Sequence, residues 1–167
     1  MKKNIFKDIK EINLDSYVDY RGHIYTSYNE KTFDQFYGKK IHFNHDKILI
    51  NTKHSLRGLH GDYKSYKLVT CGYGDVYYVL VDNRPQSETY LQWDWELLTH
   101  NNKKSLLIPS GFASSCLTLS NTSVLIYKWS YEGDYCDEKQ QFTLRWNDEK
   151  LNIHWPVKNP IISERDI

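Results

Sequence analysis

Short strand-like runs recur along the chain, and turn signals separate them. Each run alternates apolar with polar residues or is rich in β-branched and aromatic residues, as strands are. The runs cover residues 23–28, 47–51, 55–60, 68–72, 76–81, 93–98, 105–108, 113–119, 124–130 and 141–146. Turn signals such as Tyr73-Gly74-Asp75 and Pro109-Ser110-Gly111 lie between them. Short strands spaced about 8–12 residues apart predict an antiparallel sandwich or barrel.

The remaining sequence adds little helix and no sign of a second domain. Residues 29–36 are the one helical stretch expected in the first half, with Asn29 as N-cap and Phe33 and Phe36 on one face. The length of 167 residues suits one domain with a real core, and no linker, repeat or low-complexity segment interrupts it. We therefore predict a single domain over residues 1–167, an all-β jelly-roll sandwich with short peripheral helices.

The composition indicates which classes of binding partner and which cellular compartment to expect. Lys and Arg number 22 against 21 Asp and Glu, so no excess charge indicates binding to nucleic acid or an anionic membrane. No apolar run approaches a membrane span, and the first residues lack the apolar core of a signal peptide. Cys71, Cys116 and Cys136 are odd in number and show no CxxC spacing, which fits reduced thiols. We expect a cytoplasmic protein.

One of the strand-like runs, residues 55–60, carries an Arg and a His three positions apart. A strand's period of two would send Arg57 and His60 to opposite faces, but a bend at Gly58 would bring both to the mouth of a pocket. Arg suits bidentate binding of phosphate, and His exchanges a proton near neutral pH. These residues alone leave open a surface Arg beside an incidental strand His.

Metal and nucleophile chemistry are disfavoured. A metal-binding barrel of this kind needs two imidazoles two positions apart with a carboxylate nearby. No second His follows His60 before His100, and a strand would split His42 and His45 between its faces. Ser114-Ser115-Cys116 lacks the glycine-flanked elbow of a Ser or Cys hydrolase. We expect no metal site.

Ten segments resemble one known family, in that family's order and near its spacing. They are residues 19–22, 56–60, 67–69, 74–76, 81–82, 108–113, 127–128, 146–148, 155–156 and 162–166. Together they resemble the dTDP-4-dehydrorhamnose 3,5-epimerase family. The resemblance implies a cupin-like jelly roll, a homodimer that exchanges N-terminal strands, a nucleotide-linked 4-keto sugar as substrate, and no metal or organic cofactor.

The resemblance also implies catalytic roles, and the residue types suit them. A 4-keto group makes the hydrogens on C3 and C5 acidic, so epimerisation needs a base on one face, stabilisation of the enolate oxygen, and an acid on the other face. His60 matches the base and Asp166 the carboxylate that holds its other nitrogen. Tyr127 matches the acid, and Lys67 the cation beside the sugar.

Further positions match the substrate-binding residues of the family. Arg57 matches a pyrophosphate clamp, and Arg21 is a second candidate, contributed by the partner subunit. The remaining substrate-binding candidates are Thr26, Asn44, Ser114, Tyr131 and Tyr135, of which either of the last two is a candidate to stack on the base.

Departures from the dTDP-sugar pattern bear on the substrate. His23-Ile24-Tyr25-Thr26 replaces an aromatic run ending in Glu, the loop after His60 is short, Ser114 replaces a His, and residues 132–136 are extra. These features resemble a branch acting on GDP-linked 4-keto-6-deoxy-heptoses in capsule biosynthesis, which is the predicted function. The alternatives are a dTDP-4-keto-6-deoxyhexose 3,5-epimerase, a sugar 3,4-ketoisomerase, and a non-catalytic cupin sugar-binding protein. Whether C3 alone or both C3 and C5 are inverted stays open.

Overall fold

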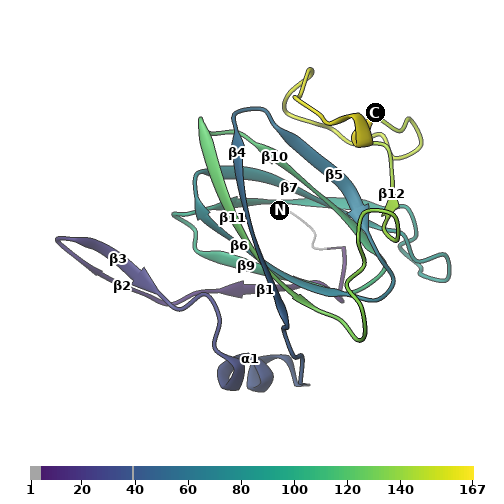
Figure 1. Ribbon diagram of the computed structural model, residues 1–167. Coiled ribbons are helices and arrows are strands. Elements are labelled where there is room, and N and C mark those ends of the chain that lie inside the picture. Colours follow the sequence, from purple (N-terminus) through teal and green to yellow (C-terminus); the bar gives the residue numbers. More distant parts are fainter. Residues whose placement is uncertain (1–4, 39) are drawn as a thin grey trace.

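Two antiparallel sheets packed face to face form the body of the protein (Figure 1). The computed structural model describes residues 5–38 and 40–167. The first sheet has the order β1-β9-β6-β11-β4 and the second the order β12-β5-β10-β7-β8. The strands of the first sheet are β1 (Lys10–Asn13), β4 (His45–Thr52), β6 (Tyr66–Tyr73), β9 (Lys104–Ile108) and β11 (Thr122–Ser130). Those of the second are β5 (Leu56–Gly61), β7 (Asp75–Asp82), β8 (Trp93–Thr99), β10 (Phe112–Thr118) and β12 (Phe142–Thr143).

The main core lies between the two sheets, and alternation along the strands builds it. On β11, Leu125, Tyr127 and Trp129 are buried while the residues between them are partly exposed. On β7, Tyr78 and Leu80 face the same interior and are buried. Because a strand sends alternate side chains to opposite faces, each sheet contributes every second residue to this core.

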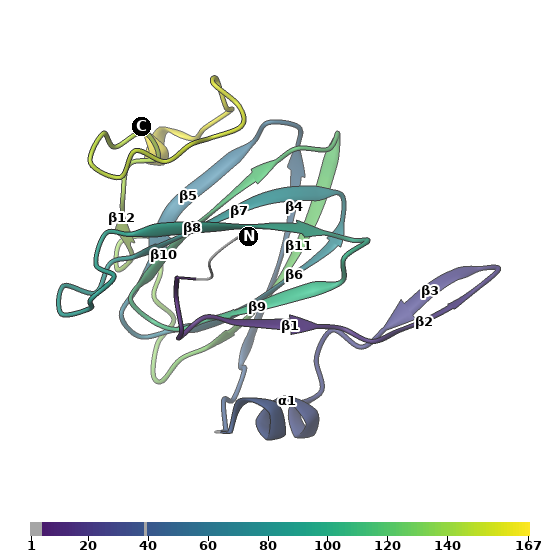
Figure 2. The same cartoon turned by 180° about the vertical axis from the view of Figure 1, so that it is seen from behind.

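Different segments cover the outer faces of the two sheets. The C-terminal segment, with Leu151, Trp146 and Trp155, packs against the outer face of the second sheet. The helix α1 (Glu30–Tyr37) covers one end of the first sheet, where Phe33 joins Leu68 and Leu107 in a separate cluster. Seen from behind, β1 runs beside β9 along the lower edge of that sheet (Figure 2).

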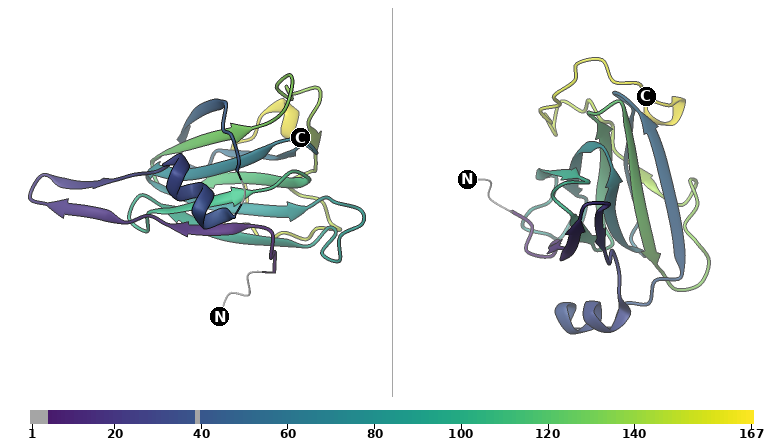
Figure 3. Two further views of the ribbon diagram at one scale, coloured as in Figure 1. Left: turned by 90° about the horizontal axis from the view of Figure 1, so that it is seen from below. Right: turned by 90° about the vertical axis from the view of Figure 1, so that its left-hand side faces the viewer.

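A hairpin of β2 (Ser16–Asp19) and β3 (Gly22–Tyr25) projects away from the body, which the view from below shows most plainly (Figure 3). Apolar and aromatic side chains on it are strongly exposed, with Tyr20 at 98% and Ile24 at 71%. Strand β4 closes one end of the first sheet, and it has no second neighbour among the described strands. Its outward residues Ile48 and Ile50 are exposed as well.

The β-sandwich prediction is confirmed, with differences in detail. The predicted strand over residues 141–146 is reduced to β12, because Leu144 and Trp146 instead pack with the C-terminal segment against the second sheet. The run 23–28 is a strand only to Tyr25, and β1 and β2 were not predicted. The helix has Asn29 as N-cap, its side chain accepting from the Thr32 backbone N–H, while the side chain of Phe36 lies outside the described residues. No helix in the described ranges is both long and apolar enough to cross a membrane.

Candidate active site

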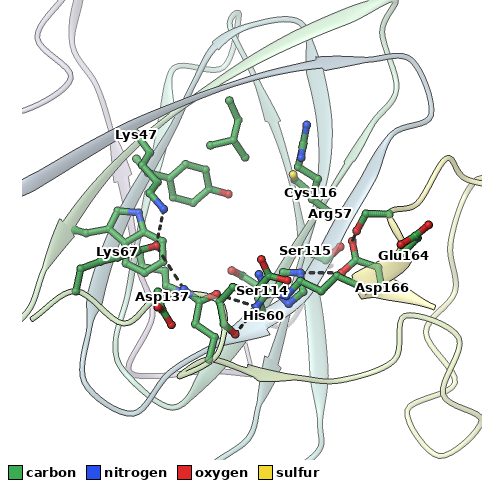
Figure 4. A pocket seen from close by; sticks show the side chains of 18 residues that line it. Lys47, Arg57, His60, Lys67, Ser114, Ser115, Cys116, Asp137, Glu164 and Asp166 are labelled. Carbon is green, nitrogen blue, oxygen red and sulfur yellow. Dashed lines mark hydrogen bonds and ion pairs between the residues drawn. The ribbon is translucent and has the colours of Figure 1, made fainter.

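A cavity of about 720 Å³ opens between the sheets, at the end of the sandwich where the C-terminal segment crosses (Figure 4). Five strands and two loops line it. Strands β4, β6 and β11 of the first sheet supply one wall, and β5 and β10 of the second supply the other. The loop after β11 and the 3₁₀ turn η1 (Glu164–Asp166) complete its rim.

A bulge in β5 brings Arg57 and His60 to the same cavity. His60 pairs with Ser114 of β10 and Arg57 pairs with Cys116, so three steps along β5 match two along β10. The extra residue falls at Gly58, whose φ of 112° is open to glycine and strained for other residues. The predicted bend at Gly58 is therefore present. Arg57 is exposed at the mouth, where its Nε donates to Asn51 Oδ1 at 2.7 Å.

His60 is held from both sides of its ring. Its Nε2 lies 2.7 Å from Asp166 Oδ1, and its Nδ1 lies 3.1 Å from the Thr143 hydroxyl oxygen. Burial by itself would raise the pKa of Asp166, but the contact with His60 and hydrogen bonds from Ser163 and the Gly58 backbone N–H outweigh it, so the pKa is lowered. An ionised Asp166 keeps a proton on Nε2, which leaves Nδ1 as the basic nitrogen.

Two lysines lie across the cavity from Asp166 (Figure 4). Lys67 pairs with Trp129 in the β6–β11 ladder, and its Nζ lies 4.5 Å from the Trp129 ring centre. Burial, aided by the nearby charge of Lys47, lowers the pKa of Lys67 to about 8, although Asp62 acts in the opposite direction. Lys47 is held differently, since its Nζ donates to the Tyr135 hydroxyl at 2.5 Å. Lys67 is thus a cation whose charge is easily lost.

Tyr127 comes from the wall opposite His60. It sits at the centre of β11, is 8% exposed, and lines the cavity. Its hydroxyl donates to the hydroxyl of Tyr78 at 3.1 Å. Burial raises the pKa of Tyr127 well above the usual value, and neighbouring Tyr78 and Cys116 raise it further. Tyr127 therefore keeps its proton at neutral pH.

The structure brings seven of the eleven predicted site residues to this cavity. They are Arg57, His60, Lys67, Ser114, Tyr127, Tyr135 and Asp166. Tyr135, rather than Tyr131, lines the cavity; Tyr131 lies outside the lining, where its hydroxyl contacts His45 Nδ1. Asn44 is also outside, because its side chain is used to bind the Tyr131 carbonyl and hold the loop.

The other two predicted residues lie on or next to the projecting hairpin. Arg21 is 74% exposed and pairs with Asp19 at 2.6 Å, and Thr26 is exposed just after β3. Within one chain, neither reaches the cavity of that chain. Arg21 could therefore reach a site only in a partner subunit, and its contribution to a partner's site stays a prediction.

Several lining residues were missed by the sequence reasoning. Lys47 and Trp129 were detectable, since both alternate inward on predicted strands beside Tyr127. The indole Nε1 of Trp129 and the hydroxyl of Ser115 are buried without a hydrogen-bond partner among the described residues, so both are available to a ligand. The rim residues Asp137, Glu138, Gln141, Glu164 and Arg165 come from loops whose positions no strand pattern predicts.

This arrangement can move protons on two faces of one small molecule. An imidazole, that of His60, stands on the second sheet, and a protonated phenol, that of Tyr127, stands on the first. Lys67 adds a cation suited to a developing oxyanion. In the described part of the chain, no three His, Cys, Asp or Glu side chains are grouped as metal ligands.

Comparisons with known proteins identify relatives of this chain. The chain is 38% identical over 152 residues to the dTDP-4-dehydrorhamnose 3,5-epimerase of Shigella flexneri, covering 89% of this chain and 82% of that one. The crystal structure of the Bacillus anthracis enzyme of that name, with TDP and PPi bound, superposes with a TM-score of 0.88 at 32% identity over 95% of this chain and 91% of that one.

A second solved structure is equally similar. It is a Legionella pneumophila dTDP-6-deoxy-D-glucose-3,5-epimerase in complex with dTDP-4-keto-L-rhamnose, with a TM-score of 0.90 at 32% identity over 97% of this chain and 86% of that one. Residues 3–167 match the family described as dTDP-4-dehydrorhamnose 3,5-epimerase. With the fold, the cavity and these matches together, the chain belongs to the dTDP-4-dehydrorhamnose 3,5-epimerase family of cofactor-independent isomerases.

Proposed function

We propose that this protein inverts C3, or both C3 and C5, of a dTDP-linked 4-keto-6-deoxyhexose. The observation that carries the proposal is the placement of His60 and Tyr127 on opposite walls of one cavity, with Lys67 beside them. His60 Nδ1 removes the proton next to the ketone, and Lys67 stabilises the enolate oxygen. Tyr127 then returns a proton to the opposite face, which inverts the carbon.

Charged and aromatic groups at the mouth support a nucleoside diphosphate as the rest of the substrate. Arg57 is exposed there and suits a bidentate contact to a pyrophosphate. Tyr135 offers an aromatic face on the lining, close to the ring of Trp129 at a centroid distance of 5.4 Å. Relatives named for dTDP sugars favour a thymine base.

A GDP-linked 4-keto-6-deoxy-heptose is a second candidate. Support comes from the cavity lining, where Ser114 and Cys116 contribute small side chains on the strand next to that of His60. Residues 132–136, which are extra relative to the dTDP-sugar pattern, also lie in the loop that carries Tyr135 to the cavity. This candidate differs from the first in the base and in one sugar carbon, and it uses the same chemistry.

Deuterium exchange tests the proposal and separates the two candidates. The protein is incubated in deuterated water with a dTDP-linked and, separately, a GDP-linked 4-keto-6-deoxy sugar. An epimerase gives an inverted product with deuterium at C3 or C5 and the ketone still at C4; one deuteron or two reports how many carbons are inverted. A 3-keto product would indicate a ketoisomerase, and no exchange with either donor would indicate a binding protein.

The first prediction concerns the base in this assay. His60→Asn should abolish exchange at both carbons and leave nucleotide binding nearly intact, because no other group in the proposed site removes the proton. General base catalysis is worth on the order of 10²–10⁴ in rate. Exchange within tenfold of the parent rate would contradict the role of His60, and calorimetry with dTDP and GDP checks binding.

We further propose a homodimer that completes each site through the projecting hairpin. The hairpin exposes Tyr17, Val18, Tyr20 and Ile24, while β4 offers an open edge with Ile48 and Ile50 exposed on its outer face. An exposed apolar arm and an unpaired strand edge are complementary, and pairing them between two copies would bury both. The hairpin would then carry Arg21 and Thr26 toward the partner's cavity.

A further inference from the structure

Tyr78 is a buried phenol that directly contacts the proposed acid. It lies on the inner face of β7, is fully buried, and accepts a hydrogen bond from the Tyr127 hydroxyl at 3.1 Å. The two ring centres are 6.5 Å apart. Because β7 belongs to the second sheet and β11 to the first, this contact crosses the interior of the sandwich.

Ser114 continues the contact toward His60. Cys116 is the register partner of Tyr78 in the β7–β10 ladder, so Ser114, two residues away, lies on the same face and diagonal to Tyr78. Burial raises the pKa of Tyr78, and the nearby Ser114 side chain acts in the opposite direction, as a hydroxyl facing the phenol would. Ser114 is also the register partner of His60 in the β5–β10 ladder. Three hydroxyls therefore run from Tyr127, through Tyr78, to the strand beside the base.

The chemistry of the acid creates a need for this contact. When Tyr127 gives its proton to the substrate carbon, its O–H bond breaks, a C–H bond forms, and a phenolate remains in a buried site. Burial raises the pKa of Tyr127, so that phenolate is costly unless a donor faces its oxygen. The Tyr78 hydroxyl is placed to be that donor, since rotating its O–H reverses the direction of the existing hydrogen bond.

We propose that Tyr78, backed by Ser114, is the positioning residue of Tyr127. It holds the phenol against the cavity wall before reaction and donates a hydrogen bond to the phenolate once the proton has left. The inference rests on the proposed epimerase function and deepens it. Tyr78 does not line the cavity, so in this proposal it acts through Tyr127.

The test compares Tyr78→Phe with a matched control on the same strand. Tyr77→Phe removes a hydroxyl from the next residue, which faces the other side of the sheet and donates to the His154 carbonyl at 3.3 Å. Deuterium wash-in with retained configuration reports proton removal by His60, and inverted product reports donation by Tyr127. In Tyr78→Phe, inverted product should form roughly ten- to hundredfold more slowly, which is the value of one hydrogen bond to a charged group. Wash-in and KM should change less than twofold, and Tyr77→Phe should leave the ratio of the two rates unchanged.

Equal losses of wash-in and inversion would overturn the proposal, because they would indicate a general structural defect. An unchanged ratio in Tyr78→Phe would overturn it too. If Tyr78→Phe does not fold, Ser114→Ala removes the outer hydroxyl of the chain at a partly exposed position, and it should shift the same ratio in the same direction.

A measurement on the free protein separates this proposal from the proposed function. With tyrosines labelled at ring carbon Cζ, the Tyr127 resonance is assigned by its loss in Tyr127→Phe. It should move in Tyr78→Phe and stay in place in Tyr77→Phe, whichever sugar the protein accepts. A parent without turnover would refute the epimerase function, whereas a Tyr127 resonance unmoved by Tyr78→Phe would refute the contact itself.

Discussion

At the scale of single residues, Lys67 is a cavity-lining lysine whose charge depends on its burial. The residue is 5% exposed, its amine lies beside the Trp129 ring and near the charge of Lys47, and burial lowers its pKa to about 8. Below pH 8 it is therefore a cation facing the cavity, and above pH 8 it becomes a neutral amine. An enolate oxygen needs the cation.

This charge predicts an alkaline limit on activity. The value of kcat/KM should fall as the pH rises through about 8, because free enzyme then loses the Lys67 charge. Lys67→Met should lower kcat/KM on the order of 10²–10³-fold at pH 7 and remove the alkaline limb of the pH profile, which is this fall above pH 8. Lys128→Met, which removes a lysine paired with Asp46 outside the cavity lining, should keep the limb. A limb that survives in Lys67→Met would assign it to another group.

The same group predicts a pH dependence of stability. The folded pKa of about 8 lies below the unfolded value, so the unfolded state binds more protons between about pH 8 and 10.5 and the parent gains stability as the pH rises through that window. Lys67→Met should therefore be more stable than the parent below pH 8, by about 3 kcal/mol at most, with the gain fading toward pH 10.5. Urea unfolding at a series of pH values measures this difference.

A substitution of Asp166 tests whether this carboxylate orients the imidazole of His60, the proposed base. Asp166→Asn keeps the size of the side chain, but its amide can donate to the imidazole and favour the wrong tautomer. Epimerisation and wash-in should fall together, on the order of 10²–10⁴-fold, with nucleotide affinity preserved. A fall in inversion alone would place Asp166 with the acid rather than with His60.

At the scale of elements, the bulge in β5 is the device that assembles the site. Gly58 has φ 112°, and a Cβ there would press on the Ser114 carbonyl oxygen of the neighbouring strand. Gly58→Ala should cost about 1–3 kcal/mol of unfolding free energy and lower activity, because Arg57 and His60 lose their shared orientation. Gly38→Ala, with φ 73° and open space around it, should cost about 1 kcal/mol and leave activity intact. Thermal and urea unfolding compare the two.

Period-two alternation explains which elements could be predicted from the sequence. β11 buries alternate residues over nine positions and β7 buries seven of its eight residues, and both strands were predicted to within two residues of their ends. The short β1 and β2 carry four residues each, too few to display a period, and their apolar residues are partly exposed in β1 and exposed in β2. The run 141–146 has strand-like residues, but packing of Trp146 against Trp155 takes it off the sheet after two residues.

For the site, the residues on strands were predictable and those on loops were not. His60, Lys67 and Tyr127 were predicted through the family resemblance, and they sit on strands whose partners in the ladders fix the face of each side chain. Arg165 and Glu138 reach the rim through irregular segments that meet at 3.7 Å between Arg165 Nε and Glu138 Oε1. The Tyr127–Tyr78 contact joins two sheets, and a pattern within one strand says nothing about the element facing it.

At the scale of the whole molecule, the proposed dimer makes a prediction that mixing can test. Arg21→Ala impairs the site that receives the hairpin, whereas His60→Asn impairs the site of its own chain. If the hairpin crosses to the partner, refolding the two variants together should recover about a quarter of the parent activity, through one intact site in each mixed dimer. His60→Asn mixed with Asp166→Asn should recover nothing. No recovery in the first mixture, despite a dimer by light scattering, would place Arg21 outside the partner's site.

The two groups proposed to transfer protons come from different sheets, so turnover requires that the sheets keep their spacing. His60 is fixed to one sheet and Tyr127 to the other, and the packed interior core, with the Tyr127–Tyr78 hydrogen bond across it, sets the gap between them. A slight loosening of that core would widen the gap while every strand kept its own hydrogen bonds. In a urea titration, inversion should therefore decline before far-UV circular dichroism changes, with wash-in by His60 the last activity to disappear. The spacing between the two sheets would then control the rate of inversion directly.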